Sequence, residues 1–362
     1  MVHRAGLFAT ELPQGEKMSV EIAVPAVPTV PHSAILGLGV YRPSRVVTND
    51  ELAESLDSSD EWIRTRSGIR SRRLCTEEET LVAMSLGSAR QAIESSGIDP
   101  QRIDCVLLAT MSSPLVTPAT APLLATELGL RGVAALDVVN ACAGFCSTVG
   151  MASDMIRAGT AEYVLVIGAE RLSDMVDWTD RTNAFLFGDG AGAAVIGPSE
   201  TVGIGPLVWG SDGSHWDMLG QNKAMGTFMD EVKELGAQAQ RPIFKMDGPA
   251  LFRWTLGALE QVCREALKRA GVTVDDLDAF IPHQANGRIT EMLARQLKLP
   301  VGCTVAYDIE EQGNTSAASV PLAMEGLLRT GAAKPGDIAL LIGFGAGLVY
   351  AAQVVRLPGV PC

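Results

Sequence analysis

The stretch CAGFCSTVGMASDMIRAG (142–159) returns in altered form 172 residues later as NTSAASVPLAMEGLLRTG (314–331). In each copy, apolar residues recur at helical spacing up to a glycine, which is a typical helix end. A short turn and an apolar run follow, YVLVIG (163–168) in the first copy and IALLIG (338–343) in the second. Continuous apolar runs of this length are typical of strands buried on both faces of a parallel sheet. The pair therefore predicts a repeated helix-and-strand unit.

A second pair of segments extends the repeat. SSGIDPQRIDCVLLA (95–109) resembles RAGVTVDDLDAFIPH (269–283), with a glycine and an aspartate at matching places 174 residues apart. Each half is therefore predicted as β-α-β-α-β, and two packed halves give a layered α/β protein with pseudo-twofold symmetry. We place the first half at 33–204 and the second at 205–362. Residues 1–32, which are rich in Pro and Val, are interpreted as a flexible arm.

Composition narrows the function classes. The chain has 362 residues, of which 47% are hydrophobic, and a net charge of −13, so we expect about two domains and a large core. An acidic protein offers no basic face to phosphate backbones, and no apolar run reaches the roughly 18 residues of a membrane span, so neither nucleic acid nor a membrane is expected as a partner. Seven irregularly spaced cysteines indicate a reducing, cytoplasmic compartment, and four histidines without paired spacing predict no metal site.

The pseudo-symmetry predicts a site at the axis between the halves. Superposed copies place Cys142 and Asn314 at equivalent helix starts, and His283 at the end of a strand in the place of Ala109. The two helix starts should meet near the axis, with His283 beside them. A helix N-terminus and a nearby imidazole favour the thiolate, which is the nucleophilic form of cysteine. The alternative is that Cys142 is an ordinary core residue.

Segments in order from about residue 34 to 357 resemble the β-ketoacyl-acyl-carrier-protein synthase III family, the condensing enzymes of the thiolase fold that start fatty-acid synthesis. The joint occurrence of Cys142, PHQAN and GNTS is the most specific part of the resemblance. It implies a five-layer αβαβα fold of two pseudo-twofold halves, and a homodimer. The run of residues is most similar to actinobacterial members. The matching segments are GLGVYRPSRVVTNDEL, SSDEWIRTRSGIRSRR, NACAGF, FLFGDGAGAAVIGP, IPHQANGRI, GNTSAASVPLAM and LIGFGAGLVYAAQVV.

The resemblance implies a role for each residue of the predicted site. Cys142 takes an acyl group from acyl-coenzyme A, while His283 and Asn314 hydrogen-bond the malonyl thioester carbonyl and stabilise the enolate that forms as CO2 leaves. The amides of Cys142 and Ala346 resemble the oxyanion hole. Asparagine at 314 is typical of the coenzyme-A-primed type, because elongating members have a second histidine there. No cofactor is implied, since the coenzyme A thioester is a substrate.

Three residues resemble the family's coenzyme A site. Trp62 and Arg181 match the pair that stacks on adenine, and Arg66 matches a contact to a nucleotide phosphate. We interpret the surrounding arginines as a basic cluster at the channel mouth. The alternatives are that Trp62 is a half-buried anchor and that the cluster is an ordinary solvated run of charge. The cluster comprises Arg64, Arg66, Arg70, Arg72 and Arg73.

The resemblance also implies surfaces for the carrier protein and the acyl chain. Gln284 and Arg288, with Arg253, match the region that docks acyl-carrier protein, although plain surface arginines would look the same. Phe252 matches an aromatic residue beside the nucleophile, and core packing explains it equally well. Thr117 matches a side chain that the partner subunit places at the end of the acyl pocket, where acetyl-selective members carry Phe. The alternative is that Thr117 only caps a turn before the next proline.

Three functions are compatible with these motifs. The first is condensation of an acyl-coenzyme A primer with malonyl-acyl-carrier protein to give 3-oxoacyl-acyl-carrier protein. The second is a same-fold acyltransferase that moves the acyl group from coenzyme A to another acceptor without decarboxylation. The third is a non-enzymatic partner subunit, against which the intact Cys142 argues. Pro249 and the loop 111–118 depart from the family pattern, which leaves open the primer and the choice between primary fatty-acid and specialised polyketide synthesis.

Overall fold

Two five-stranded sheets organise the molecule, whose computed structural model describes residues 32–359. The expected arm lies outside the described residues except for His32, which begins the first strand. Both sheets have the same strand order, β1-β7-β6-β4-β5 in the first and β8-β14-β13-β11-β12 in the second. The first sheet consists of β1 His32–Tyr41, β4 Ile103–Ala109, β5 Ala134–Val138, β6 Tyr163–Glu170 and β7 Gly190–Ser199. The second consists of β8 Val208–Ser211, β11 Ala279–Pro282, β12 Thr304–Val305, β13 Ile338–Gly345 and β14 Val349–Arg356.

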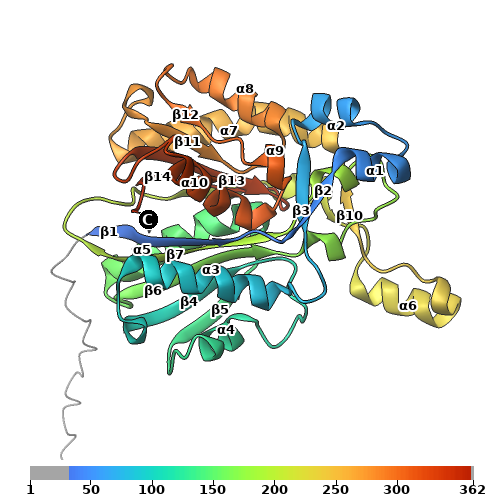
Figure 1. Cartoon of the computed structure of the whole chain (residues 1–362), viewed down its shortest axis with the longest axis horizontal. Helices are drawn as coiled ribbons and strands as arrows, with labels where there is room; N and C mark the ends of the chain where they lie inside the picture. The colour runs from blue at the N-terminus through green and yellow to red at the C-terminus, as the bar shows by residue number, and fades with distance from the viewer. Residues whose placement is uncertain (1–31, 360–362) are drawn as a thin grey trace, which may run out of the picture.

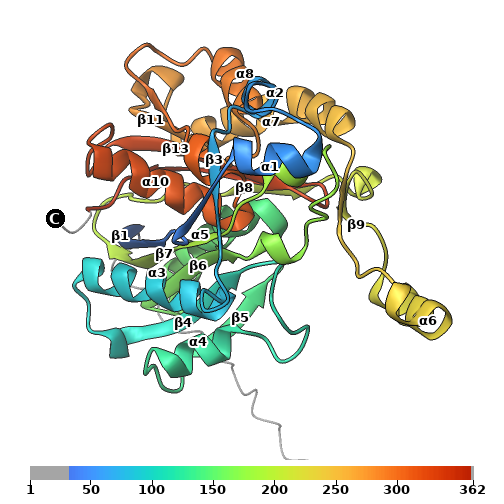
Figure 2. The ribbon, with the colours of Figure 1, turned by 45° about the vertical axis from the view of Figure 1, so that its right-hand side comes forward.

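The main helices form three layers around these sheets (Figures 1 and 2). Two helices lie between the sheets, and a pair covers the outer face of each sheet. The predicted αβαβα fold of two pseudo-twofold halves is confirmed. The central helices are α5 Gly144–Ala158 and α10 Ser319–Thr330. The outer pairs are α3 Leu81–Ser96 with α4 Ala121–Glu127, and α7 Gly248–Ala270 with α8 Gly287–Leu297.

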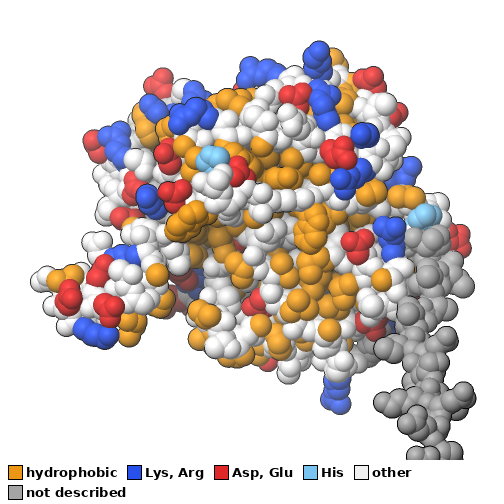
Figure 3. Space-filling model, turned by 180° about the vertical axis from the view of Figure 1, so that it is seen from behind, with side chains coloured by type: hydrophobic (Ala, Val, Ile, Leu, Met, Phe, Trp, Pro, Cys, Tyr) orange, Lys and Arg blue, Asp and Glu red, His pale blue; other side chains and the backbone are white. Residues whose placement is uncertain are grey.

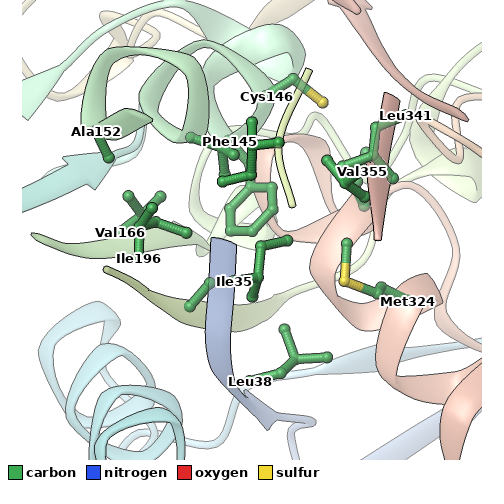
Figure 4. Packing of buried hydrophobic residues seen from close by; sticks show 14 of the residues in the cluster. Ile35, Leu38, Phe145, Cys146, Ala152, Val166, Ile196, Met324, Leu341 and Val355 are labelled. Carbon is green, nitrogen blue, oxygen red and sulfur yellow. The ribbon is translucent and has the colours of Figure 1, made fainter. Parts of the chain in front are cut away.

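The central layer carries a core that both halves share. Phe145 of α5 lies fully buried among Ile35 and Val166 of the first sheet and Leu341 and Val355 of the second, as Figure 4 shows. Burying one such aromatic or aliphatic side chain stabilises a fold by about 1.5–3 kcal/mol. Apolar packing of this kind therefore joins the two halves.

The two copies of the repeat differ in the length of their central helix. α5 has 15 residues and α10 has 12. Both end at a left-handed glycine cap, Gly159 and Gly331. The copies therefore align at the helix ends, as the sequence predicts, but are offset by about one turn at the helix starts.

This offset corrects the predicted equivalence of Cys142 and Asn314. The turn before each central helix begins at a residue with positive φ, Ala141 at 44° and Ser316 at 48°. Cys142 thus corresponds to Ala317, and Asn314 lies in the loop that enters the second turn. The offset is not evident in the sequence, because the glycines that end both helices keep the 172-residue spacing whatever the helix lengths.

Most of the smaller elements pack around one end of the central layer, over a separate apolar cluster. The helix α6 projects away from the body of the molecule, and none of its residues is buried (Figures 1 and 2). Among residues 32–359, no helix is both long and apolar enough to span a membrane. The smaller elements are β2 Arg45–Thr48, α1 Asn49–Leu56, α2 Asp60–Ser67, β3 Ser71–Leu74, β9 Leu219–Gln221, α6 Met225–Leu235, β10 Phe244–Met246 and α9 Ile309–Gln312.

Candidate active site

The turn Ala141–Ala143 places Cys142 at the N-terminal end of α5, where its side chain is almost buried. This turn contacts the turn Ser316–Ala318 of the other half. The predicted meeting of the two helix starts is thus confirmed. β13 crosses so close to the thiol that a Cβ at Gly345 would lie 2.9 Å from Cys142 Sγ. Only glycine leaves that space open beside the sulfur.

One cavity brings the three predicted residues together. Cys142, His283 and Asn314 all line it, as do Ala346 and Phe252. The predicted convergence of thiol, imidazole and amide is therefore what the structure shows. The rest of the wall is largely apolar and includes Leu186, Phe187, Phe244, Met246, Leu251 and Ile289. An apolar wall with few polar groups suits a thioester with an aliphatic chain.

His283 is held as an uncharged hydrogen-bond donor. It follows β11 directly, and its Nδ1 lies 2.7 Å from Ser319 Oγ. The Ser319 hydroxyl oxygen also accepts from the Gln284 N–H, so we assign the hydroxyl as the donor to Nδ1. The ring proton is then on Nε2, and this N–H points away from Ser319. Burial lowers the pKa of His283 to about 3, so the ring is neutral at physiological pH.

Asn314 is oriented by the backbone on both sides. Its N–H donates to Leu186 O at 2.7 Å, and its C=O accepts from Gly188 N at 3.0 Å. Its Oδ1 accepts from the Ser316 N–H at 2.9 Å, which assigns the amide nitrogen to the opposite side of the side chain. Asn314 therefore offers a neutral N–H donor, as His283 does.

The protonation of Cys142 corrects one prediction. The pKa of its thiol is raised to about 12, chiefly by burial; Ser316 lowers the pKa, and the carboxyl of Glu170 adds to the rise that burial causes. The imidazole expected to favour the thiolate is itself uncharged. The resting site therefore holds a protonated thiol, which must lose its proton as it attacks.

Trp62, Arg66 and Arg181 lie together at α2, as predicted. The guanidinium carbons of Arg66 and Arg181 lie 4.4 Å and 5.6 Å from the centre of the Trp62 ring. The ring also packs edge-on against Phe185 at 5.2 Å between centroids. Both interpretations of Trp62 thus have support, as an anchor on one side and a stacking surface on the other.

Arg72 contradicts the predicted basic cluster. It is fully buried and donates to the Val47 and Phe185 carbonyls and to Asn49 Oδ1. Arg73 donates to the Pro43 carbonyl. The alternating strand β3 turns Arg72 inward, so a run of arginines in the sequence does not form one patch.

Gln284 contradicts the predicted docking surface. Its side chain is buried, donates to the carbonyls of Pro282 and Ala306, and accepts from the Ile309 N–H. All of these partners lie within the same half, so Gln284 is a structural residue. It fixes the segment that carries His283.

The remaining predicted residues lie at the surface. Arg253 and Arg288 are exposed on α7 and α8, next to Phe252 and Ile289 of the cavity wall. Thr117 is exposed on the loop that follows β4 and is not part of the cavity wall of its own chain. The structure neither supports nor contradicts the roles predicted for Arg253, Arg288 and Thr117.

Two functional candidates were missed from the sequence, Ser319 and Glu170. Ser319 orients His283 from the first residue of α10. Glu170 is a carboxylate at the end of an otherwise apolar strand, YVLVIGAE, and that position is the signal that could have drawn attention to it. Within residues 32–359, no group of three or more His, Cys, Asp or Glu side chains could hold a metal ion.

A fold of this kind, with a thiol and two neutral donors where its central helices meet, is that of an acyl-transferring condensing enzyme. Models of the 3-oxoacyl-[acyl-carrier-protein] synthase III family match residues 136–213 and, for its C-terminal part, 267–357. The chain belongs to this family.

Three relatives illustrate the similarity. Beta-ketoacyl-[acyl-carrier-protein] synthase III of Mycobacteroides abscessus is 52% identical over 90% of this chain and 95% of its own. Beta-ketoacyl-[acyl-carrier-protein] synthase III 1 of Streptomyces coelicolor is 51% identical over 91% of this chain and 97% of its own. The crystal structure of a priming β-ketosynthase from a polyketide biosynthetic pathway has a TM-score of 0.89 and 44% identity, covering 93% of this chain and 99% of that one. The predicted actinobacterial character agrees with these relatives.

Proposed function

We propose that the protein condenses an acyl-coenzyme A primer with malonyl-acyl-carrier protein, giving 3-oxoacyl-acyl-carrier protein, CO2 and coenzyme A. The observation that carries this function is that one apolar cavity is lined by Cys142, His283 and Asn314 together. The reaction needs no cofactor, because the thioester supplies the activated acyl group. The enzyme acts in the cytoplasm, where cysteines stay reduced; the six cysteines within residues 32–359 are all free.

The site supports a reaction in two halves. Cys142 Sγ first attacks the acyl thioester, and the Cys142 and Ala346 amides stabilise the oxyanion. The malonyl carboxylate then leaves as CO2, and the N–H groups of His283 and Asn314 stabilise the enolate that attacks the acyl cysteine. Neutral donors suit this second half, because a charged imidazolium would bind the malonyl carboxylate and hold it in place.

Coenzyme A and the carrier protein approach from the side of α2, α7 and α8. Trp62 and Arg181 stack on the adenine, and Arg66 contacts a nucleotide phosphate; stacking of this kind contributes about 1 kcal/mol at an exposed site. Arg253 and Arg288 face the acidic carrier protein. In a chain with a net charge of −13, exposed arginines beside the cavity give a local positive surface for both partners.

Product analysis tests the function directly. The protein is incubated with acyl-coenzyme A and malonyl-acyl-carrier protein, and the carrier is examined by mass spectrometry. We expect the 3-oxoacyl form, longer by two carbons than the primer. A carrier that bears the unextended acyl group would show the acyltransferase instead, and an unmodified carrier would contradict both enzymes.

The chain is expected to form a homodimer through its first half. β5 is an edge strand paired only with β4. Hydrophobic side chains are exposed on it and directly after it, Leu136 at 40% and Val139 at 77%. Figure 3 shows that hydrophobic side chains gather over a broad area of one face. An uncovered edge strand with apolar neighbours favours pairing with a second copy about a twofold axis. Light scattering at micromolar concentration should give twice the chain mass, and a monomer would contradict this.

The dimer places Thr117 in the primer pocket of its partner. The loop that carries Thr117 also exposes Leu115 at 57% and Val116 at 99%, which fits insertion into a second subunit. Threonine in place of phenylalanine leaves a longer pocket, and each buried CH2 contributes about 0.8 kcal/mol, so two or three carbons shift preference by about one to two powers of ten. We expect four- to six-carbon acyl-coenzyme A to be preferred over acetyl-coenzyme A.

Competition assays on wild type, Thr117→Phe and the conservative Thr117→Ser check this preference. Thr117→Phe should shift kcat/KM toward acetyl-coenzyme A, and Thr117→Ser should behave as wild type. A higher kcat/KM for acetyl-coenzyme A in the wild type would show that the pocket argument is wrong.

A further inference from the structure

Glu170 is a buried carboxylate to which the reaction above gives no role. It ends β6 with a side chain that is 0% exposed. The adjacent Arg171 does not neutralise it, since that guanidinium pairs with Asp174. Its oxygens instead accept hydrogen bonds from Ser112 Oγ at 2.6 Å, Ser316 Oγ at 3.1 Å, Thr110 Oγ1 at 3.2 Å and the Met111 amide at 3.3 Å. A buried carboxylate held only by neutral donors is costly and calls for an explanation.

Ser316 connects this carboxyl group to the nucleophile. Its hydroxyl donates to Glu170 Oε1, and its turn contacts the turn Ala141–Ala143 that carries the thiol. Its backbone N–H donates to Asn314 Oδ1, and its φ of 48° is a conformation that non-glycine residues rarely adopt. The loop thus holds Ser316 against the carboxyl group, at the contact between the two turns, in a strained backbone conformation.

We propose that Glu170 accepts the proton of Cys142 through Ser316 while the acyl group is transferred from coenzyme A. As Cys142 Sγ bonds to the acyl carbon, its proton passes to Ser316 Oγ and the hydroxyl proton of Ser316 passes to Glu170. The bond between the acyl carbon and the coenzyme A sulfur then breaks. The departing thiolate takes a proton from Ser316, and Glu170 returns its proton to Ser316, so acyl cysteine and coenzyme A thiol form with no net change in the relay.

The ionisation of the neighbouring groups favours Glu170 over His283 as the proton acceptor. Burial raises the pKa of Glu170 to about 7, which matches a general base at neutral pH. His283, with its pKa lowered to about 3, is a far weaker base. The Cys142 thiol is a titratable group near Glu170 in the site. The hydrogen-bond partners of Glu170, from the loop after β4 and from the turn Ser316–Ala318, are hydroxyls and an amide.

The test measures the acylation half-reaction alone, as the rate of acyl-Cys142 formation from acyl-coenzyme A across pH. The inference rests on the proposed function only for this first half, so failure of carbon-chain extension leaves the test intact. Ionised Glu170 is the active form, so the wild-type rate constant should rise with pH through about 7 and then level off. In Glu170→Gln, the rate constant should fall about 100-fold, and the rise near neutral pH should disappear.

Two further variants separate a proton relay from a structural role. Ser316→Ala interrupts the relay and should lower the rate as Glu170→Gln does; the backbone tolerates alanine there, since Ala141 has the same positive φ in the other half. Ser112→Ala removes a hydrogen bond that lowers the pKa of Glu170, so the rise in rate should move to higher pH. A general loss of folding would not move that midpoint.

A matched control and a second readout complete the design. Glu162→Gln removes an exposed carboxylate just before the start of the same strand and should leave the rate unchanged. Glu170→Gln that has been acylated by long incubation should still extend malonyl-acyl-carrier protein. The proposal is overturned if Glu170→Gln keeps the wild-type rate and pH profile, or if it slows both half-reactions equally.

Discussion

Cys142→Ala should abolish formation of the acyl-enzyme, lowering its rate by at least ~10⁴-fold. The physical reason is that Cys142 is the thiol that lines the cavity, while the nearby Cys146 lies in the shared core. A methyl group in place of the thiol leaves no atom that can form the thioester. Mass spectrometry of the intact protein after incubation with acyl-coenzyme A measures the adduct directly.

The matched control is Cys146→Ala, one helical turn away. This substitution removes a thiol of the same type from a fully buried position outside the cavity. It should cost some stability, because it leaves a small void, but the acyl adduct should still form. An adduct of wild-type abundance on Cys142→Ala would contradict the assignment of the nucleophile.

His283→Ala and Asn314→Ala should separate the two half-reactions. Each removes one neutral donor from the enolate, and loss of such a donor typically lowers the rate of the step about 10²–10³-fold. Acylation should persist within about tenfold, because neither side chain takes the thiol proton in the proposed relay. The measurement loads the variant with the acyl group, adds malonyl-acyl-carrier protein, and follows CO2 release and the extended carrier.

His283→Ala is the cleaner of the two variants. Asn314→Ala also removes the acceptor for the Ser316 N–H, and an unpaired buried N–H costs about 1–3 kcal/mol. If both variants lose extension equally and His283→Ala keeps acylation, the result supports a role for both side chains as donors to the enolate. Abundant extension by Asn314→Ala would show that the amide does not stabilise the enolate.

The sequence predicted the layers and the convergence of the site, although the predicted equivalence of Cys142 and Asn314 is wrong. The paired apolar strands and glycine-capped helices identified two equivalent halves, and His283 does follow its strand where Ala109 ends the matching one. Cys142 and Asn314 are not equivalent, yet they meet because Cys142 lies in the first turn, Asn314 lies in the loop that leads into the second, and the two turns contact across the axis. The residues of the site therefore converge whatever the exact register of the repeat.

Burial of individual polar side chains could not be predicted. Arg72 lies between two half-buried residues, Ser71 and Arg73, and only the direction of its side chain places it inside. Gln284 is likewise buried although the next residue, Ala285, is half-buried. The contacts of Glu170 come from the loop after β4 and from Ser316, which is 146 residues away in the chain. Networks assembled from such distant segments leave no local pattern in the sequence.

The doubled architecture has an evolutionary consequence. In the first half, a Cβ at Gly144 would lie 2.9 Å from Ala109 Cβ, so two minimal side chains pack where the second half places the hydrogen bond between His283 and Ser319. A symmetric pair of identical half-length chains would have to carry the same residues at both places. Joining the halves in one polypeptide removes that constraint, so one copy can retain close packing and supply the nucleophile while the other diverges to supply the proton donors.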